Sequence, residues 1–297
     1  MMYTLQNKKL KISVKKTGAE LCDISAIKNK TRFMWHADPD IWEAHAPNLF
    51  PIIGALKNNT YFFDNKSYTL PKHGFIRNNN DMQLHEQTEN SLTFKLASNE
   101  ALLEIYPFKF EFHITFALKD NSVEVRHTII NNDNKTMFFS VGGHPAFKCP
   151  VFENENYEDY LLEFEYPERS KTHLINMEKG LMSSKTKSVF HNSNTIPLTH
   201  DLFNQDALVF KDLKSRKVTL KSKLKGNVLT VHYPDFPYLG IWAKPAGDYV
   251  CIEPWLGIAD HEDTDQNFTD KEGVLALAPE KTFEAAYTIE IHNTHLV

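Results

Sequence analysis

The sequence predicts an all-β protein, a large β-sandwich with few short helices. Apolar and polar residues alternate with a period of two over long stretches, which is typical of strands with one buried face. Short polar segments separate these stretches at the spacing of hairpin turns. The 297 residues include 21 Phe and 11 Tyr, and such side chains suit the facing surfaces of two packed sheets better than helix packing.

The alternating segments can be placed in chain order. They are the hairpins 61–70, 108–129 and 218–231, with turns at residues 64–65, 119–121 and 225–227, and the closing strand 286–292. The apolar run 135–140 is predicted as a further, buried strand. Only Pro39–Ala44 and Asn99–Leu103 are predicted as short helices, and the polar run Asn192–Thr195 as a loop.

Histidine is abundant, with 14 in the chain, so a single one carries little information. His127 lies on the apolar face of its predicted strand, and we expect a hydrogen-bonded core histidine there. His113, His191, His200 and His292 have no distinguishing context and are expected at the surface.

Composition restricts the class of protein. No linker or repeat divides the chain, so residues 1–297 are predicted to form one domain. A net charge of -5 argues against a general electrostatic grip on nucleic acid or on an anionic membrane. No apolar stretch approaches the roughly 20 residues of a membrane helix. The N-terminal segment lacks the apolar core of a signal peptide, so we expect a cytoplasmic protein.

Three segments set an ionisable side chain beside glycine or proline at the end of an apolar run. They are Val141–Phe147 with His144, Leu70–Phe75 with His73, and Val250–Trp255 with Glu253. Glycine permits unusual backbone torsions and proline fixes its own, so these side chains can be held rigidly at a cleft. We expect all three to face one pocket and to move protons there.

Each candidate also has an ordinary structural interpretation. His73 can be a turn histidine that caps a carbonyl, and His144 has a similar alternative. Glu253 is the most pointed signal, since a carboxylate at the end of a buried strand is costly unless it is paired or used. Trp255 can offer a flat apolar face to a sugar or simply fill the core. Asp206 can bond a substrate hydroxyl or act as a turn residue.

Metal binding is the main rival for two histidines and a carboxylate, because zinc sites and facial triads use those ligands. We rank it lower, since no compact spacing such as His-x-His supports it. Cys22, Cys149 and Cys251 fit no metal or disulfide framework and are expected to be reduced thiols. The acidic run 260–265 lacks the glycine and terminal glutamate of an EF-hand loop. We therefore predict no metal.

Several motifs in order resemble the aldose 1-epimerase (galactose mutarotase) family, and in particular its LacX-like bacterial branch. They are Asn48–Gly54, Tyr68–Phe75, Gly143–Phe147, Asp206–Phe210, Cys251–Gly257 and Asp270–Gly273. Together with Trp42 and the closing strand they cover nearly the whole chain. A run of motifs in the same order is far more specific than any one of them alone.

The resemblance implies a galactose-mutarotase-type β-sandwich that interconverts α and β sugar anomers without a cofactor. It assigns Glu253 as general base, His144 as general acid, His73 as a second histidine at the ring oxygen, and Asp206 as a ligand for sugar hydroxyls. With ordinary pKa values of about 4.3 and 6.5, we expect an ionised Glu253 beside a protonated His144. Trp255 and Phe75 would then pack against the sugar.

The chain departs from the family at one position. Many relatives carry a substrate-contacting arginine after Phe-Pro-Ile-x-Gly, where this chain has Ala55. Arg77 or Lys57 can substitute for it, and either can equally be a solvated charge. Two alternatives to an aldohexose mutarotase therefore stay open. One is a sugar-binding or sensing protein without turnover, which Ala55 favours.

The other alternative is a hexose-6-phosphate 1-epimerase, which needs basic residues at the rim of the pocket. Lys57, Lys72, Arg77 and Lys148 are the nearby candidates. In every case the expected partner is a small-molecule sugar or its phosphate, with no nucleic acid and no membrane. The sequence leaves open whether the chain is a monomer or a homodimer.

Overall fold

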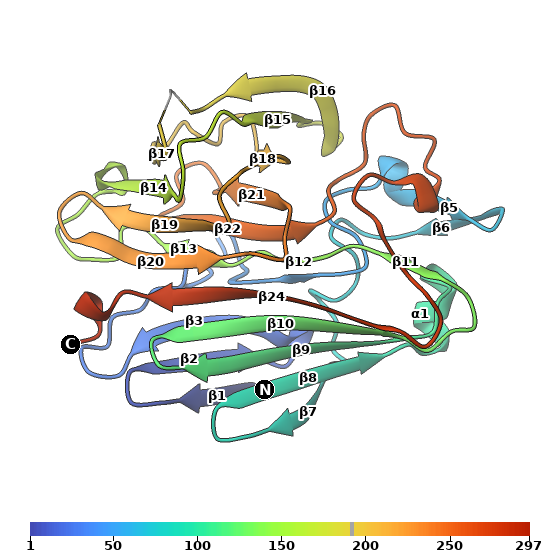
Figure 1. Ribbon diagram of the computed structural model, residues 1–297, viewed down its shortest axis with the longest axis horizontal. Helices are drawn as coiled ribbons and strands as arrows, with labels where there is room; N and C mark the ends of the chain where they lie inside the picture. Colours follow the sequence, from blue (N-terminus) through green and yellow to red (C-terminus); the bar gives the residue numbers. More distant parts are fainter. Residues whose placement is uncertain (191–192) are drawn as a thin grey trace.

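The computed structural model describes residues 1–190 and 193–297, and its strands form several antiparallel sheets (Figure 1). The largest sheet consists, in spatial order, of β17 (Thr195–Pro197), β14 (Tyr160–Phe164), β19 (Lys217–Ser222), β20 (Gly226–His232), β24 (Thr282–Ile291), β10 (Ser122–Asn131), β9 (Phe110–Lys119), β8 (Ser91–Ala97) and β7 (Gln83–Gln87). Strands β8, β9, β10 and β24 lie below β18, β21 and β22 in Figure 1. This arrangement confirms the all-β sandwich class.

The second large sheet carries most of the positions of interest. It consists of β16 (Leu181–Ser188), β15 (Lys171–Asn176), β18 (Leu208–Phe210), β21 (Tyr238–Trp242), β22 (Tyr249–Leu256), β12 (Val141–Gly143) and β4 (Asn48–Leu49), and β13 (Ala146–Lys148) also pairs with β22. Strand β22 is buried along its full length, because neighbours flank it on both edges and other layers cover both faces.

Smaller elements complete the described part of the chain. The remaining strands are β1 (Met2–Gln6), β2 (Leu10–Lys15) and β3 (Glu20–Ala26) in a three-stranded sheet, and the pairs β5 (Thr60–Phe63) with β6 (Lys66–Thr69) and β11 (Met137–Phe139) with β23 (Leu275–Leu277). The helical pieces are α1 (Glu100–Ile105), η1 (Thr17–Ala19), η2 (Lys57–Asn59), η3 (Tyr157–Asp159), η4 (Phe268–Asp270) and η5 (Asn293–His295). No helix in residues 1–190 and 193–297 is long and apolar enough to cross a bilayer.

The period-two alternation translates directly into burial. Along β9, β10 and β24, buried residues alternate with half-buried ones, and the strands pair in register as two long antiparallel ladders. The predicted hairpins 61–70, 108–129 and 218–231 are confirmed as β5–β6, β9–β10 and β19–β20. The predicted single domain over residues 1–297 stays a prediction.

One of the two predicted helices is confirmed. The Asn99 side chain accepts a hydrogen bond from the Leu102 backbone N–H and caps α1. Pro39–Ala44, in contrast, contains only a turn at residues 39–41. Beyond the turn, the half-buried Trp42 ring stacks on Tyr249, with ring centroids 5.4 Å apart. This contact with a distant segment competes with the local helical pattern.

Two sequence predictions concern residues at the edge of what the structure describes. His191 and the first residue of the predicted loop Asn192–Thr195 lie outside the described residues. Of the other histidines expected at the surface, His200 is exposed, whereas His113 and His292 are half-buried. His113 contacts Glu111 and His292 contacts Thr230 on the polar outer face of the largest sheet.

His127 is fully buried, as expected, but it is not hydrogen-bonded. Its ring lies among Phe112, Phe236 and Tyr287, and neither ring nitrogen has a hydrogen-bond partner among the described residues. Desolvation in this aromatic surrounding lowers the pKa of His127 to about 3. The prediction of a hydrogen-bonded core histidine is therefore wrong, because the flanking side chains offer rings instead of polar groups.

A buried ion pair fixes the loops beside β22. Lys271 Nζ lies 2.8 Å from Asp260 Oδ1, and both side chains are 4% exposed. The other carboxylate oxygen, Oδ2, accepts a hydrogen bond from the Lys57 backbone N–H, and the Asp260 N–H donates to the Ala55 carbonyl. The Asp260 carboxylate therefore ties residues 55–57 to the segment that follows β22.

His127 should make the protein sensitive to mild acid. The unfolded chain binds this proton near pH 6.5 and the folded chain only near pH 3, so proton uptake below pH 6.5 favours unfolding. The cost is about 2 kcal/mol at pH 5 and grows until pH reaches about 3. We expect His127→Leu to lose about 2 kcal/mol less unfolding free energy than wild type between pH 7 and pH 5. Urea titrations at both pH values measure this, and identical losses in the two proteins would contradict it.

Removing the cation of the buried pair should destabilise the fold strongly. We expect Lys271→Met to cost about 3–5 kcal/mol, because Asp260 is left buried without its counter-ion. The double variant Lys271→Met with Asp260→Asn should recover most of that loss, since the amide oxygen can still accept from the Lys57 N–H without needing a cation. Urea unfolding of both variants is the measurement. A single variant no less stable than the double would refute this account.

Candidate active site

A cavity of about 390 Å³ opens beside strands β18 and β22, within the usual size range of small-molecule sites. Six of the eight predicted site residues line it. They are His73, Arg77, His144, Asp206, Glu253 and Trp255. The sequence distances between them are large, so it is the packing of the sheets that brings them together.

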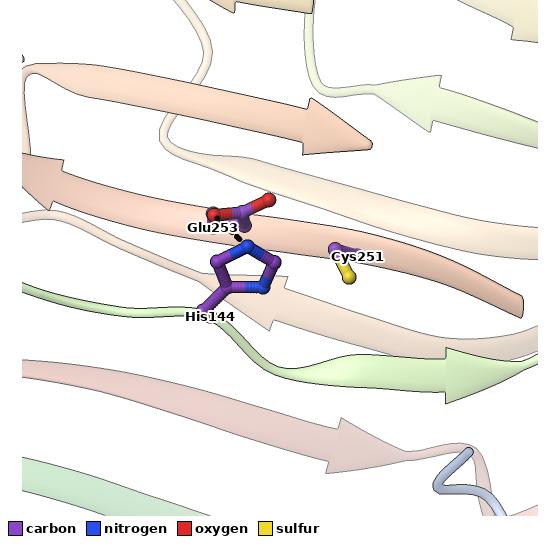
Figure 2. Close-up of side chains that lie close together, drawn as sticks. All are labelled: His144, Cys251 and Glu253. Atoms are coloured by element: carbon purple, nitrogen blue, oxygen red, sulfur yellow. Dashed lines mark ion pairs between the residues drawn. The ribbon is translucent and has the colours of Figure 1, made fainter. Parts of the chain in front are cut away.

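Glu253 and His144 both line this cavity, and their side chains point toward each other (Figure 2). Glu253 Oε2 lies 3.1 Å from His144 Nε2. Glu253 is 1% exposed and His144 is 8% exposed. The contact is not an aligned hydrogen bond. Within the described residues, Glu253 Oε2 and the opposite ring nitrogen, His144 Nδ1, both lack a well-oriented partner. Such unpaired polar atoms are costly in a dry site and are available to a ligand.

The strand context of Glu253 differs from the prediction. We expected the glutamate at the end of a buried strand, but β22 continues through Pro254, Trp255 and Leu256. Glu253 pairs with Gly240 on β21, where a Cβ atom would meet the Trp255 ring at 2.5 Å. The tryptophan ring covers Gly240, so only glycine fits there. His144 does follow directly after β12, as predicted for a strand end.

Burial shifts the pKa values of Glu253 and His144. Both shifts oppose the expected pairing of an ionised glutamate with a protonated histidine. Desolvation raises the pKa of Glu253 well above its usual value, and Asp206 adds to this, while Lys72 and Arg77 oppose it. Desolvation also lowers the pKa of His144 to about 3. A separated charge pair is therefore disfavoured in the empty site.

His73 is held in an unusual backbone conformation beside the pair. Its φ is 67°, in the left-handed region that few non-glycine residues adopt. Its N–H donates to the Gly54 carbonyl, and the Gly54 N–H donates to His73 Nδ1 at 3.1 Å. Nδ1 is thus an acceptor, which places the proton of the neutral ring on Nε2. Burial, followed by the charge of His144, lowers the pKa of His73 well below 6.5.

Asp206, Arg77 and Lys72 add polar groups to the cavity wall. Asp206 also has a left-handed φ, 70°, and its Oδ1 accepts from the Ala207 N–H at 2.7 Å. Arg77 Nε is buried without a hydrogen-bond partner among the described residues. Lys72 is exposed and lines the same cavity. The cavity therefore combines one carboxylate acceptor with two cations.

Two of the predicted substrate-binding residues lie elsewhere. Phe75 packs edge-on against Phe50 and stacks with Phe110 in the core, so its ring is not in the cavity wall. Lys57 points to the neighbouring acidic loop, where its Nζ donates to the Thr264 carbonyl. Ala55 is buried and its carbonyl accepts from Asp260. Of the two side chains proposed to replace the missing arginine, only Arg77 reaches the cavity.

Two tryptophans in the cavity wall were not assigned from the sequence. The Trp42 ring lies 5.1 Å from the His144 ring, and the Trp242 ring meets it edge-on at 5.8 Å. With Trp255, three of the four tryptophans in the chain line this one cavity. The scarcity of tryptophan was the available signal. The contacts of Trp42 and Trp242 with His144 could not be predicted from the sequence, because they join distant parts of the chain.

Cys251 lies beside the same pair (Figure 2). Ligand atoms of His144, Cys251 and Glu253 all lie within 4.8 Å of one another, and across the described ranges no other such trio of His, Cys, Asp or Glu was found. All three cysteines are free and buried, as predicted. The sequence pattern did not predict that one of these thiols would border the candidate acid–base pair.

Known proteins resemble this chain over most of its length, in sequence and in fold. The family model described as aldose 1-epimerase matches residues 1–269. The chain is 34% identical over 301 residues to the chromosomal LacX protein of Lactococcus lactis subsp. lactis, covering 99% of this chain and 100% of that protein.

Solved structures agree over the same length. A galactose mutarotase related enzyme from Lactobacillus acidophilus is 36% identical with a TM-score of 0.91, covering 99% of this chain and 98% of that one. A galactose mutarotase-like protein from Lactobacillus casei ATCC 334 is 28% identical with a TM-score of 0.91, covering 98% and 100%. On these full-length matches, the chain belongs to the aldose 1-epimerase family.

Proposed function

We propose that this protein is an aldose 1-epimerase that interconverts the α and β anomers of an aldohexose. The observation that carries the proposal is the Glu253–His144 contact of 3.1 Å inside a cavity of sugar size. The His73 ring lies 5.7 Å from the His144 ring, nearly perpendicular to it. One carboxyl group and two imidazoles therefore surround a single space, as anomer exchange requires.

The reaction needs one proton removed and one delivered. The Glu253 carboxylate takes the proton of the C1 hydroxyl, while His144 Nε2–H protonates the ring oxygen as the C1–O5 bond breaks. His73 Nε2–H donates a hydrogen bond to the same oxygen. Rotation about C1–C2 followed by the reverse transfers closes the ring as the other anomer, and both residues return to their starting state.

The buried pair can supply the reactive ionic form without exchanging protons with solvent. One proton shared by the pair suffices, because moving it from Glu253 to His144 creates the carboxylate and the imidazolium together. Lys72 and Arg77 favour the carboxylate electrostatically. Sugar hydroxyls that hydrogen-bond to the ions would replace lost water and lower the cost of separating the charges.

The remaining wall suits a sugar. Asp206 accepts hydrogen bonds from hydroxyl groups, and the rings of Trp42, Trp242 and Trp255 cover apolar faces. Free sugars already exchange anomers slowly, so positioned acid–base groups suffice and we propose no cofactor. We place the protein in the cytoplasm, which its three free thiols support. Its proposed role there is in hexose metabolism, with a small sugar as its partner.

Replacing the base tests the proposal most directly. We expect Glu253→Gln to lower kcat for anomer exchange by about 10²–10⁴-fold with little change in KM, because the amide cannot accept the proton. Polarimetry or NMR exchange spectroscopy of freshly dissolved glucose and galactose gives the rates. The control is Glu168→Gln, which alters a buried carboxylate outside the cavity and should keep the wild-type rate. An unchanged rate in Glu253→Gln would overturn the assignment.

A second candidate substrate is a hexose 6-phosphate, which Lys72 and Arg77 in the cavity favour, since Arg77 Nε has no hydrogen-bond partner among the described residues. We expect Arg77→Met to lower kcat/KM by about 10-fold or more, since it removes a charged hydrogen-bond donor. Comparing glucose and galactose with their 6-phosphates decides the substrate. An equal loss on all of them assigns Arg77 to hydroxyl binding, and a loss confined to the phosphates assigns it to phosphate. An unchanged kcat/KM on all of them would remove Arg77 from the site.

The third candidate is a protein that binds sugar without turnover. Ala55 favours it, because the family's usual arginine is missing at that position. Calorimetry with the same sugars separates this function from the proposed one. Heat of binding without acceleration of anomer exchange would support a sensor, whereas acceleration excludes it.

A further inference from the structure

The thiol of Cys251 has no role in the proposed reaction, although it lies against the two groups that perform it. Cys251 and Glu253 are two positions apart on β22, so their side chains lie on the same face of the strand. His144 approaches that face from the segment between β12 and β13. Figure 2 shows the cysteine beside the imidazole, one alternate position along the strand from the glutamate.

The three side chains together form a donor set that is not satisfied by the protein. Cys251 is fully buried, Glu253 almost fully, and His144 is 8% exposed. Glu253 Oε2, an oxygen that an ion would contact, has no aligned hydrogen-bond partner within the described ranges. Buried polar atoms without partners point to a missing ligand, and His144 and Glu253 both face the open cavity from which one could enter.

The chemistry of these donors is that of a zinc site with an open position. Thiolate, imidazole and carboxylate are the three usual zinc ligands, and three protein ligands leave a fourth position for a water molecule. A divalent cation with one thiolate and one carboxylate is electrically neutral, which suits a site that disfavours net charge. Hard cations such as Mg²⁺ prefer oxygen ligands and would gain little from the thiol.

The distances require only local adjustment. In tetrahedral zinc sites the ligand atoms lie about 3.3–3.6 Å apart, given bonds of about 2.0–2.3 Å. His144 Nε2 and Glu253 Oε2 are already 3.1 Å apart. The ligand atoms of the trio lie within 4.8 Å of one another, so an approach of the sulfur by roughly 1 Å would reach the spacing of a tetrahedral site.

We propose that His144, Cys251 and Glu253 bind a thiophilic divalent cation such as Zn²⁺, and that the ion blocks anomer exchange. Binding would occupy His144 Nε2 and a Glu253 oxygen, the atoms that otherwise exchange protons, so this second part rests on the proposed function. All three ligands bind an ion in their deprotonated forms, so protons compete with the metal for the site. Affinity therefore falls as pH falls.

Metal binding can be measured without reference to activity. Titration of the purified chain with Co²⁺ should give a thiolate-to-cobalt charge-transfer absorption in the near ultraviolet that saturates at one equivalent. Cys251→Ser should lose this absorption and bind Zn²⁺ at least about 10-fold more weakly in calorimetry, because the soft ligand is gone. Cys22→Ser is the matched control, since that buried thiol lies on β3 and donates to the Glu20 carbonyl, which serine can also do.

Histidines elsewhere on the surface can also bind Co²⁺ or Zn²⁺. The cobalt absorption and the zinc affinity are therefore compared between wild type and its variants. If Cys251→Ser does not fold, as judged by circular dichroism, Glu253→Gln removes the charge of a second ligand and should also weaken the one-equivalent binding. An absent cobalt–thiolate absorption in wild type, or equal zinc affinity in wild type and Cys251→Ser, would overturn the site.

Inhibition is measured separately as the ratio of anomer-exchange rates with and without Zn²⁺ within each protein. We expect strong inhibition of wild type and Cys22→Ser that a chelator reverses, and at least about 10-fold more zinc for the same inhibition of Cys251→Ser. If the wild-type protein shows the cobalt–thiolate absorption but does not accelerate anomer exchange, the proposed function is wrong and the metal site is still supported. Anomer exchange that saturating zinc leaves unchanged would end the inhibitory role.

Discussion

The exclusion of water from one strand governs most of this site. Strand β22 is buried along its whole length, and Glu253 has no solvent to stabilise a charge there. Desolvation raises the pKa of the glutamate and lowers the pKa of His144 and His73. The same environment strengthens every interaction that a substrate can make with an ionised group. Charge separation in such a site is therefore costly while the cavity is empty, and a polar ligand that replaces the missing water lowers that cost.

The surrounding structure keeps that environment rigid. Trp42 and Trp242 hold the imidazole of His144 from two directions, so its nitrogen stays aimed at the carboxyl group. His73 is fixed by reciprocal hydrogen bonds with Gly54, and Gly54 itself abuts Ala259, where a Cβ would meet the neighbouring Cβ at 2.4 Å. The Asp260–Lys271 pair then ties this segment to the chain after β22. The acid–base groups thus depend on contacts between segments far apart in sequence.

The sequence predicted the parts of the structure that local pattern controls. Period-two alternation gave β9 and β10 with their turn, since each residue's burial there follows from its own position in the strand. Local residue context singled out His73, His144, Asp206 and Glu253, and the family resemblance supplied the role expected of each. The expectation of an ionised Glu253 beside a protonated His144 did not allow for desolvation, which shifts both pKa values the other way and depends on burial by distant layers. The sequence placed Phe75 beside the sugar and missed Cys251 beside His144 for the same reason, since only the packed structure determines which neighbours each side chain meets.

The loop that carries His73 shows how this chain can compensate for Ala55. Lys72, His73 and Arg77 lie on one short segment, and all three line the cavity. Two glycines let other parts of the backbone pack closely against this segment. A Cβ atom at Gly74 would lie 2.2 Å from the Phe50 carbonyl oxygen, and a Cβ atom at Gly18 would lie 2.4 Å from the Arg77 carbonyl oxygen. A cation at position 77 is therefore positioned by the same backbone that orients His73. In a chain with arginine at position 55 the substrate-binding charge and the second histidine would sit on different segments, whereas here any shift of the loop moves both together. A change that loosens the loop should therefore displace the Arg77 cation and the His73 imidazole together.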